Sequence, residues 1–181
     1  VVAMVERHAP PLEGWPNLKH FSHTFNATFI VKDAVKASKF FADILDYKIY
    51  MEVHNDAPPQ GANVLGIPHN INATAKRDVY IMHPKGTNAG SIELLSYDNL
   101  MGHDFSNLTR PENFGLSSLR YPVTDVKKKA EDLINKGIAL TFPPTIVNLA
   151  PYGPVNLFAF QTPSGVRFEY FEPITTKREQ Q

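Results

Sequence analysis

Hydrophobic residues repeat along the chain in two rhythms, one typical of strands and one typical of helices. In residues 25–32 apolar residues alternate with polar ones, which predicts a strand with one buried face. In residues 34–45 apolar positions instead recur every three or four residues, which predicts a helix. Asp33 precedes this helix and can cap it, because its carboxylate accepts hydrogen bonds from the free backbone N–H groups of the first turn.

Three further strands are expected in the first half of the chain, at residues 47–54, 79–83 and 91–97. A polar loop with Pro58, Pro59 and Gly61 separates the first two of them, over about residues 55–76. Loops of this length in a compact domain are usually functional lids or mobile segments, and the sequence leaves both open.

The same order of elements recurs in the second half. A strand at about 115–123 leads to Asp125, which is placed to cap a helix that Gly137 ends. A strand near 138–142, a loop rich in proline and asparagine, and a hairpin over 156–173 follow. The hairpin turns at Pro163-Ser164-Gly165, where proline fixes one backbone angle and glycine accepts a positive φ.

The chain therefore reads as strand, helix and three strands, twice, and a repeated unit of this kind is expected to pair with its twin. The predicted organisation is an extended arm, a first βαβββ module, a connector, a second βαβββ module and a flexible tail, at residues 1–22, 23–98, 99–114, 115–173 and 174–181. The predicted fold class is α+β, with the two modules forming a curved, cup-like mixed sheet and the helices outside.

The alternation of each strand also predicts which side chains face away from the helices. In each module the helix covers the apolar face of the sheet, so the polar positions go to the other face. These positions are Asn26, Thr28, Glu93, Ser118, Arg120, Arg167 and Glu169. Tyr50, Glu52 and His54 join them if strand 47–54 alternates without interruption. A cup lined in this way suits a small ligand, although the polar face of an antiparallel sheet often meets only water.

Composition narrows the choice of partners. Eighteen basic residues balance eighteen acidic ones, so net charge gives no reason to expect nucleic acid or an anionic membrane as a partner. The absence of cysteine excludes disulfides, zinc-thiolate sites and thiol nucleophiles, and is typical of a cytoplasmic protein. No apolar run has the length of a membrane span, and the start of the chain lacks the pattern of a signal peptide.

Three features together resemble the vicinal oxygen chelate superfamily, which includes glyoxalase I, bleomycin-resistance proteins and extradiol dioxygenases. They are the V-x-D pattern before each helix, the paired βαβββ modules, and the motif T-P-S-G-V-R-F-E-Y-F-E near the end. The resemblance covers about residues 23–173. It implies metal ligands on the first and last strands of each module, and the matching positions here are Asn26, Ser118, Glu93 and Glu169.

Metal sites of this superfamily use two histidines on the first strands, and this sequence has Asn26 and Ser118 at those positions instead. Amide and hydroxyl groups are weak ligands for Fe, Zn, Ni and Mn, so an iron dioxygenase is disfavoured. Glu93 and Glu169 would still hold a hard divalent cation together with water.

Three kinds of function fit these residues. The first is an isomerase or lyase acting on a small oxygenated metabolite, with Glu93, Glu169 and His54 as catalytic acids or bases. Its substrate-binding residues would be Asn26, Thr28, Ser118, Arg120, Phe158, Arg167 and Phe171. The second is a metal-free small-molecule binder or resistance protein, in which aromatic rings such as Phe158 and Phe171 stack on the ligand. The third is a non-catalytic interaction module.

The two arginines have two interpretations of their own. Arg120 and Arg167 can orient an anionic substrate, or they can neutralise the glutamates by pairing with them. The expected partners are a small-molecule ligand and a second copy of the chain in a homodimer.

Overall fold

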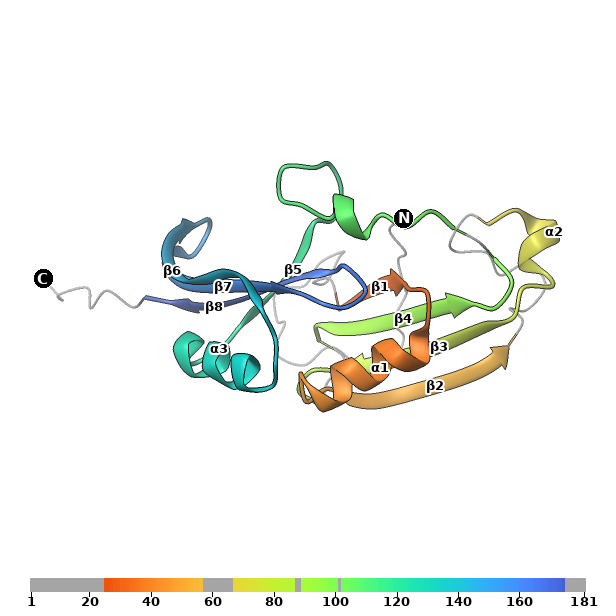
Figure 1. The fold of residues 1–181 in the computed structure, drawn as a ribbon, viewed down its shortest axis with the longest axis horizontal. Coiled ribbons are helices and arrows are strands. Elements are labelled where there is room, and N and C mark those ends of the chain that lie inside the picture. Colours follow the sequence, from red (N-terminus) through yellow and green to blue (C-terminus); the bar gives the residue numbers. More distant parts are fainter. Residues whose placement is uncertain (1–24, 57–66, 87–88, 101, 175–181) are drawn as a thin grey trace, which may run out of the picture. The chain divides into compact units, whose positions relative to one another are not determined.

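The computed structural model describes residues 25–56, 67–86, 89–100 and 102–174. The expected arm at 1–22, residues 57–66 of the expected loop and residues 175–181 of the tail lie outside this range. Contacts within the chain divide it into two compact units, residues 1–101 and 102–181 (Figure 1).

The first unit is a four-stranded mixed sheet with one long helix. Its elements are β1 (Asn26–Ile30), α1 (Ala34–Asp43), β2 (Lys48–Asp56), α2 (His69–Asn72), β3 (Arg77–His83) and β4 (Ser91–Tyr97). The strands lie in the order β1-β4-β3-β2, and β1 runs parallel to β4 while the other neighbours are antiparallel.

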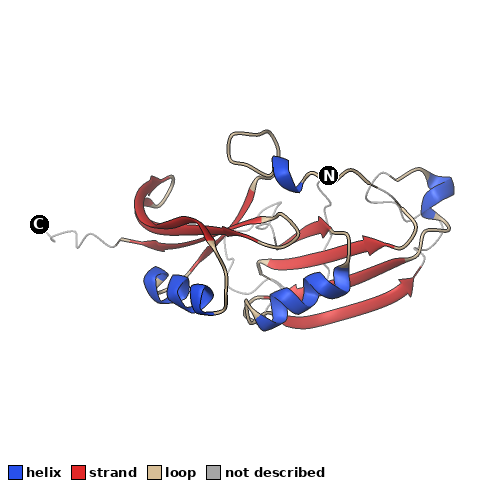
Figure 2. Ribbon diagram, in the orientation of Figure 1, coloured by secondary structure: helices blue, strands red, loops and turns tan. Residues whose placement is uncertain are grey.

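The second unit repeats this arrangement. Its elements are the 3-10 helix η1 (Ser106–Leu108), β5 (Ser118–Pro122), α3 (Val126–Asn135), β6 (Leu140–Leu149), β7 (Gly153–Gln161) and β8 (Arg167–Pro173). The strand order β5-β8-β7-β6, with β5 parallel to β8, is that of the first unit. Figure 2 distinguishes the helices and strands of both units by colour. The predicted α+β class and the two βαβββ modules are therefore confirmed.

Both predicted helix caps are present and have the same geometry. The Oδ1 atom of Asp33 accepts the backbone N–H of Lys36 at 2.9 Å, and that of Asp125 accepts the N–H of Lys128 at 2.9 Å. The backbone angles of the two aspartates agree within 2°. At the end of the second helix, Gly137 has a φ of +85°, as predicted for the residue that closes it.

Helix α3 covers a sheet face built of aromatic side chains. The rings of Phe158, Phe160, Phe168 and Tyr170 pack on one another, and the ammonium of Lys129 on α3 lies 5.5 Å from the ring centre of Tyr170. Phe158 is completely buried here. The expectation that Phe158 stacks on a ligand is corrected, because its ring belongs to the core beneath α3.

Strand β6 is longer than the sequence predicted. A loop was expected after residue 142, but the strand continues through Pro143 and Pro144 to Leu149. Proline cannot donate to a strand ladder, and β6 tolerates two because it is the edge strand and its pairing with β7 shifts register between Phe142 and Thr145.

Candidate functional site

The most organised polar group of the second unit is centred on Glu169 of β8. This side chain is only 8% exposed. Its Oε2 atom accepts hydrogen bonds from Arg120 of β5, at 2.7 Å from Nε and 2.6 Å from Nη2. Its Oε1 atom accepts from Nε of Arg167 at 3.0 Å. Both carboxylate oxygens are thus engaged by guanidinium groups.

Strand register explains why these three side chains meet. Arg120 lies directly opposite Glu169 across the parallel β5–β8 pair, and Arg167 precedes Glu169 by two residues on the same face. On the other side of Glu169 the neighbour in β7 is Ala159. The two arginines therefore pair with Glu169, the second of the interpretations that the sequence left open.

An apolar cluster lies beside this group on the same face of the sheet. Val155, Leu157 and Phe171 are buried together, with Phe142, Val147 and Leu149 against them. The ring of Tyr152 lies 4.8 Å from that of Phe171, centre to centre. Phe171 lies two residues after Glu169 on the same face of β8, but it is 3% exposed and so forms a buried wall. Its expected role as an open stacking surface is corrected accordingly.

The equivalent position in the first unit has a different partner. Glu93 of β4 lies opposite Thr28 of β1, as Glu169 lies opposite Arg120, and its Oε2 accepts the Thr28 hydroxyl at 2.8 Å. Two residues before this pair, Asn26 lies opposite Ser91. At the equivalent place in the second unit, Ser118 lies opposite Arg167. Among the described residues, Glu93 forms no ion pair.

His54 does not share a sheet face with Glu93, and the prediction that it does is wrong. The β2–β3 register runs from Ile49 opposite Met82 to Met51 opposite Ile81, so Tyr50 is an extra residue in a β-bulge. The bulge reverses the alternation of β2 from Met51 to Val53, and a second register shift lies between Val53 and Asp56. Glu93 pairs with Ile81, whereas His54 turns to the other face with Tyr80.

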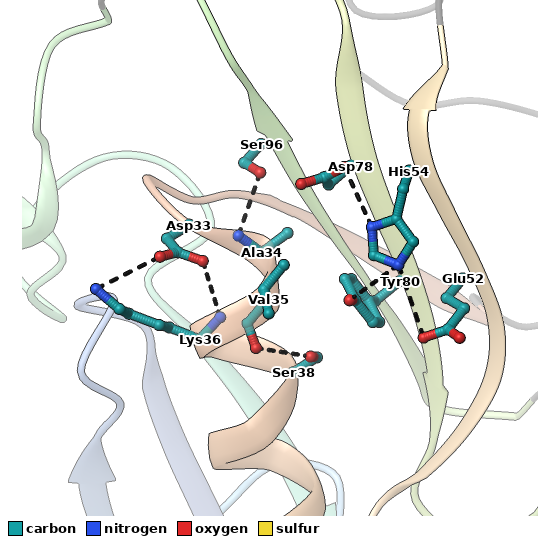
Figure 3. Close-up of polar contacts among 10 residues, drawn as sticks. All are labelled: Asp33, Ala34, Val35, Lys36, Ser38, Glu52, His54, Asp78, Tyr80 and Ser96. Atoms are coloured by element: carbon teal, nitrogen blue, oxygen red, sulfur yellow. Dashed lines mark hydrogen bonds and ion pairs between the residues drawn. The ribbon is translucent and has the colours of Figure 1, made fainter.

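That other face is the one that α1 covers. The Nδ1 atom of His54 lies 3.3 Å from Oδ1 of Asp78, and its Nε2 atom lies 3.3 Å from the Tyr80 hydroxyl and 3.9 Å from Oε2 of Glu52 (Figure 3). Burial is the main cause that raises the pKa of the Tyr80 phenol, and the charge of Glu52 adds to it. A hydrogen bond with the side chain of Ser38 on α1 acts in the opposite direction. The two carboxylates flank opposite ring nitrogens of His54, so they cannot chelate one ion with it.

The structure also places His83, whose side the sequence did not determine. Ile81 lies opposite Glu93, so His83, two residues further along β3, belongs to the Glu93 face. Its ring is buried and stacks on that of Tyr50 at 4.4 Å between centres, and its Nε2 atom has no hydrogen-bond partner in the described part of the chain. The alternation of β3 puts His83 on the same side as Ile81, but only the pairing of β3 with β4 shows that this side is the Glu93 face.

The residues at the expected metal positions do not fit a metal ion. Glu169 is neutralised by two guanidinium groups, and Glu93 offers one carboxylate beside neutral Thr28 and Asn26. Across the described ranges, no three His, Asp or Glu side chains are grouped so that they would hold a cation.

None of the helices in the described segments has the length and apolar character that a membrane span requires.

Comparison with solved structures identifies the fold. A glyoxalase family protein from Bacillus cereus superposes with a TM-score of 0.65 at 16% identity, over 88% of this chain and 99% of that one. TnmS3, an antibiotic binding protein from Streptomyces, gives 0.53 at 17% identity, over 87% and 100%. A glyoxalase/bleomycin resistance protein/dioxygenase superfamily member from Sphaerobacter thermophilus gives 0.51 at 18%, over 84% and 98%.

The chain thus has the vicinal oxygen chelate fold of the glyoxalase and bleomycin-resistance proteins. No protein-family model matches the sequence, and no curated protein matches it significantly. At these identities the likeness shows the fold alone, so activity has to be argued from the side chains.

Proposed function

We propose that the protein is a small-molecule binder that recognises an oxygenated organic ligand without a metal ion at Glu93 or Glu169. One observation carries the proposal: Glu169, at a metal-ligand position of the fold, is bound by Arg120 and Arg167. A carboxylate with two cationic partners keeps no net negative charge with which to attract a cation.

The same group is well arranged to bind oxygen atoms of a ligand. A guanidinium has five N–H donors, and Arg120 directs those on Nε and Nη2 to Glu169. Its remaining donors are held in a fixed plane by that contact, and its side chain is 37% exposed. The group carries two positive charges and one negative charge, so a carbonyl, phenolate or carboxylate oxygen would be favoured next to it.

An apolar surface sets the second requirement for the ligand. The partly buried side chains of Phe142, Val147 and Leu149 pack against the buried cluster around Phe171, which adjoins Glu169 along β8, so a ligand that contacts Arg120 lies near them. An aromatic or polyketide-like skeleton that carries oxygen substituents combines both features. The structural likeness to an antibiotic binding protein supports this ligand class.

A titration with such compounds tests the proposal. The probes are hydroxylated aromatic acids and polycyclic quinones, followed by calorimetry on metal-free protein. Arg120→Gln should weaken binding at least about tenfold, the effect of losing one charge-assisted hydrogen bond. Lys127→Gln, on the exposed side of α3, removes the same charge and should change nothing. Equal affinity in folded Arg120→Gln and wild-type protein would contradict the proposal.

A second candidate is an isomerase or lyase that uses Glu93 as its base. It is favoured by the contrast with Glu169, because Glu93 accepts one hydroxyl hydrogen bond and no ion pair from the described residues. Such an enzyme would exchange an acidic C–H proton of its substrate with solvent deuterium. Glu93→Gln should abolish this exchange, whereas exchange that persists in the variant would exclude Glu93 as the base.

The proposal includes a homodimer in the cytoplasm. The balanced charge supports a protein that binds neither nucleic acid nor membranes, and the lack of cysteine supports the compartment. Light scattering coupled to size-exclusion chromatography tests the oligomeric state.

A further inference from the structure

A small polar pocket lies within the second unit, where residues 106–111 pack against the β7–β8 turn. Gly165 in this turn is buried, with a φ of +82°, and a Cβ atom added to it would lie 2.2 Å from Cβ and 2.6 Å from Cα of Ser106. The side-chain amide of Gln161 donates to the carbonyl oxygens of Ser106 at 3.2 Å and Gly165 at 2.8 Å. The segment is therefore fixed against the turn by close packing and by hydrogen bonds.

The pocket is lined almost entirely by polar side chains. Its volume is about 180 Å³, and Arg110, Arg167, Thr109, Thr141, Ser106 and Asn107 contribute to its wall. None of the residues that line it is acidic. The nearby carboxylate of Asp104 is bound to the backbone N–H of Ser106 at 2.8 Å. A pocket of this size with two guanidinium groups and hydroxyls suits a tetrahedral or planar oxyanion.

Both guanidinium groups are oriented by contacts on one edge. Nε of Arg110 donates to the carbonyl oxygen of Asn107 at 3.2 Å. Nε of Arg167 donates to Glu169 at 3.0 Å, and its Nη1 lies 3.5 Å from the Thr141 hydroxyl. Because Glu169 is shared between Arg120 and Arg167, the charge of Arg167 is only partly neutralised, and Arg110 adds a further positive charge.

We propose that this pocket is a binding site for a small oxyanion, a phosphate or a carboxylate group, held between Arg110 and Arg167. The site goes beyond the proposed recognition at Arg120, since it uses the segment 106–111 and the β7–β8 turn. Its ligand is either a free anion or the anionic group of a larger molecule.

Inorganic phosphate and acetate are the probes for a direct test. Each is titrated into isotopically labelled protein at constant ionic strength, with chloride as the reference anion, and backbone amide shifts are followed. Phosphate, acetate or both should shift the amides of Thr109, Thr141 and Gln161 in a saturable way, and Arg110→Gln should weaken that binding about tenfold or more. Lys127→Gln removes the same charge from the surface of α3 and should leave it unchanged.

Gly165→Ala separates the pocket from general electrostatic attraction. The variant keeps every charge but displaces Ser106, so it should also lose saturable binding, with its folded state checked by circular dichroism. Non-saturable shifts with both anions, or binding that Arg110→Gln leaves intact, would overturn the proposal. Arg110→Gln leaves the contacts of Arg120 with Glu169 intact and should not change binding of the oxygenated aromatic ligand, so failure here is distinguishable from failure of the proposed function. If a larger molecule that carries a phosphate or carboxylate group binds more tightly than phosphate or acetate and competes with them, the ligand is the larger molecule and not the free anion.

Discussion

Arg120 and Glu169 face each other across the parallel β5–β8 pair, with Nη2 and Oε2 only 2.6 Å apart. The matching pair in the first module is Thr28 and Glu93, a hydroxyl and a carboxylate 2.8 Å apart. The two modules thus place the same acid in the same register and give it different partners. This difference provides an internal control for each experiment on Glu169.

Glu169→Gln should destabilise the protein by about 2 to 4 kcal/mol, because it leaves two guanidinium groups without their shared carboxylate. A double-mutant cycle with Arg120→Gln should give a coupling energy of about 2 kcal/mol. Urea denaturation of the four proteins measures both quantities. Additive effects of the two substitutions would show that the pair contributes nothing as a pair.

Glu93→Gln should cost less than about 1 kcal/mol in the same assay. The amide oxygen of glutamine still accepts the Thr28 hydroxyl, and no charged partner is lost. A loss as large as that of Glu169→Gln would mean that Glu93 has a charged partner or ligand in solution.

His54→Ala should lower stability by about 1 kcal/mol and leave ligand affinity unchanged. The variant removes contacts with Asp78 and Tyr80 on the α1 side of the first sheet. Denaturation and the ligand titration, run on one preparation, test both halves of this prediction. A tenfold loss of affinity without loss of stability would show that His54 contacts the ligand, and would contradict its placement on the α1 side of the sheet.

Tyr80 and Tyr97 should each titrate above the ordinary tyrosine value of 10.0. Burial is the main cause that raises the pKa of each phenol, with the charge of Glu52 adding to it at Tyr80. Both folded pKa values lie above the unfolded value of 10.0, so the stability these groups contribute is present below pH 10 and is lost as pH rises beyond it.

The ultraviolet absorbance of tyrosinate follows this titration directly. Tyr80→Phe and Tyr97→Phe should each remove one late-titrating group. If neither substitution changes the alkaline end of the curve, the burial of these phenols in solution differs from that in the structure.

The sequence predicted the elements better than it predicted which side chains face together. Alternation, Asp33, Asp125 and Gly137 were sufficient for the two βαβββ modules, because strand period and helix caps are local properties. The face of His54 depended on two register shifts in β2, one at Tyr50 and one between Val53 and Asp56, which only the pairing of β2 with β3 reveals. The same limit left the side of His83 undetermined.

The candidate site was predictable in position and not in chemistry. The alternation of β5 and β8 placed Arg120, Arg167 and Glu169 on one face, where the structure has them. Whether the arginines pair with the glutamate depends on side-chain conformation, which alternation does not describe. The burial of Phe158 and Phe171 likewise comes from α3 and from β6, elements distant in the sequence.

The metal content of protein purified without chelator tests the central claim most directly. Because Glu169 is bound by Arg120 and Arg167, elemental analysis should find no stoichiometric Zn, Ni, Fe or Mn in the wild type, in Glu169→Gln or in Glu93→Gln. One metal ion per chain in the wild type that Glu169→Gln abolishes would contradict the account, because Glu169 would then be a metal ligand.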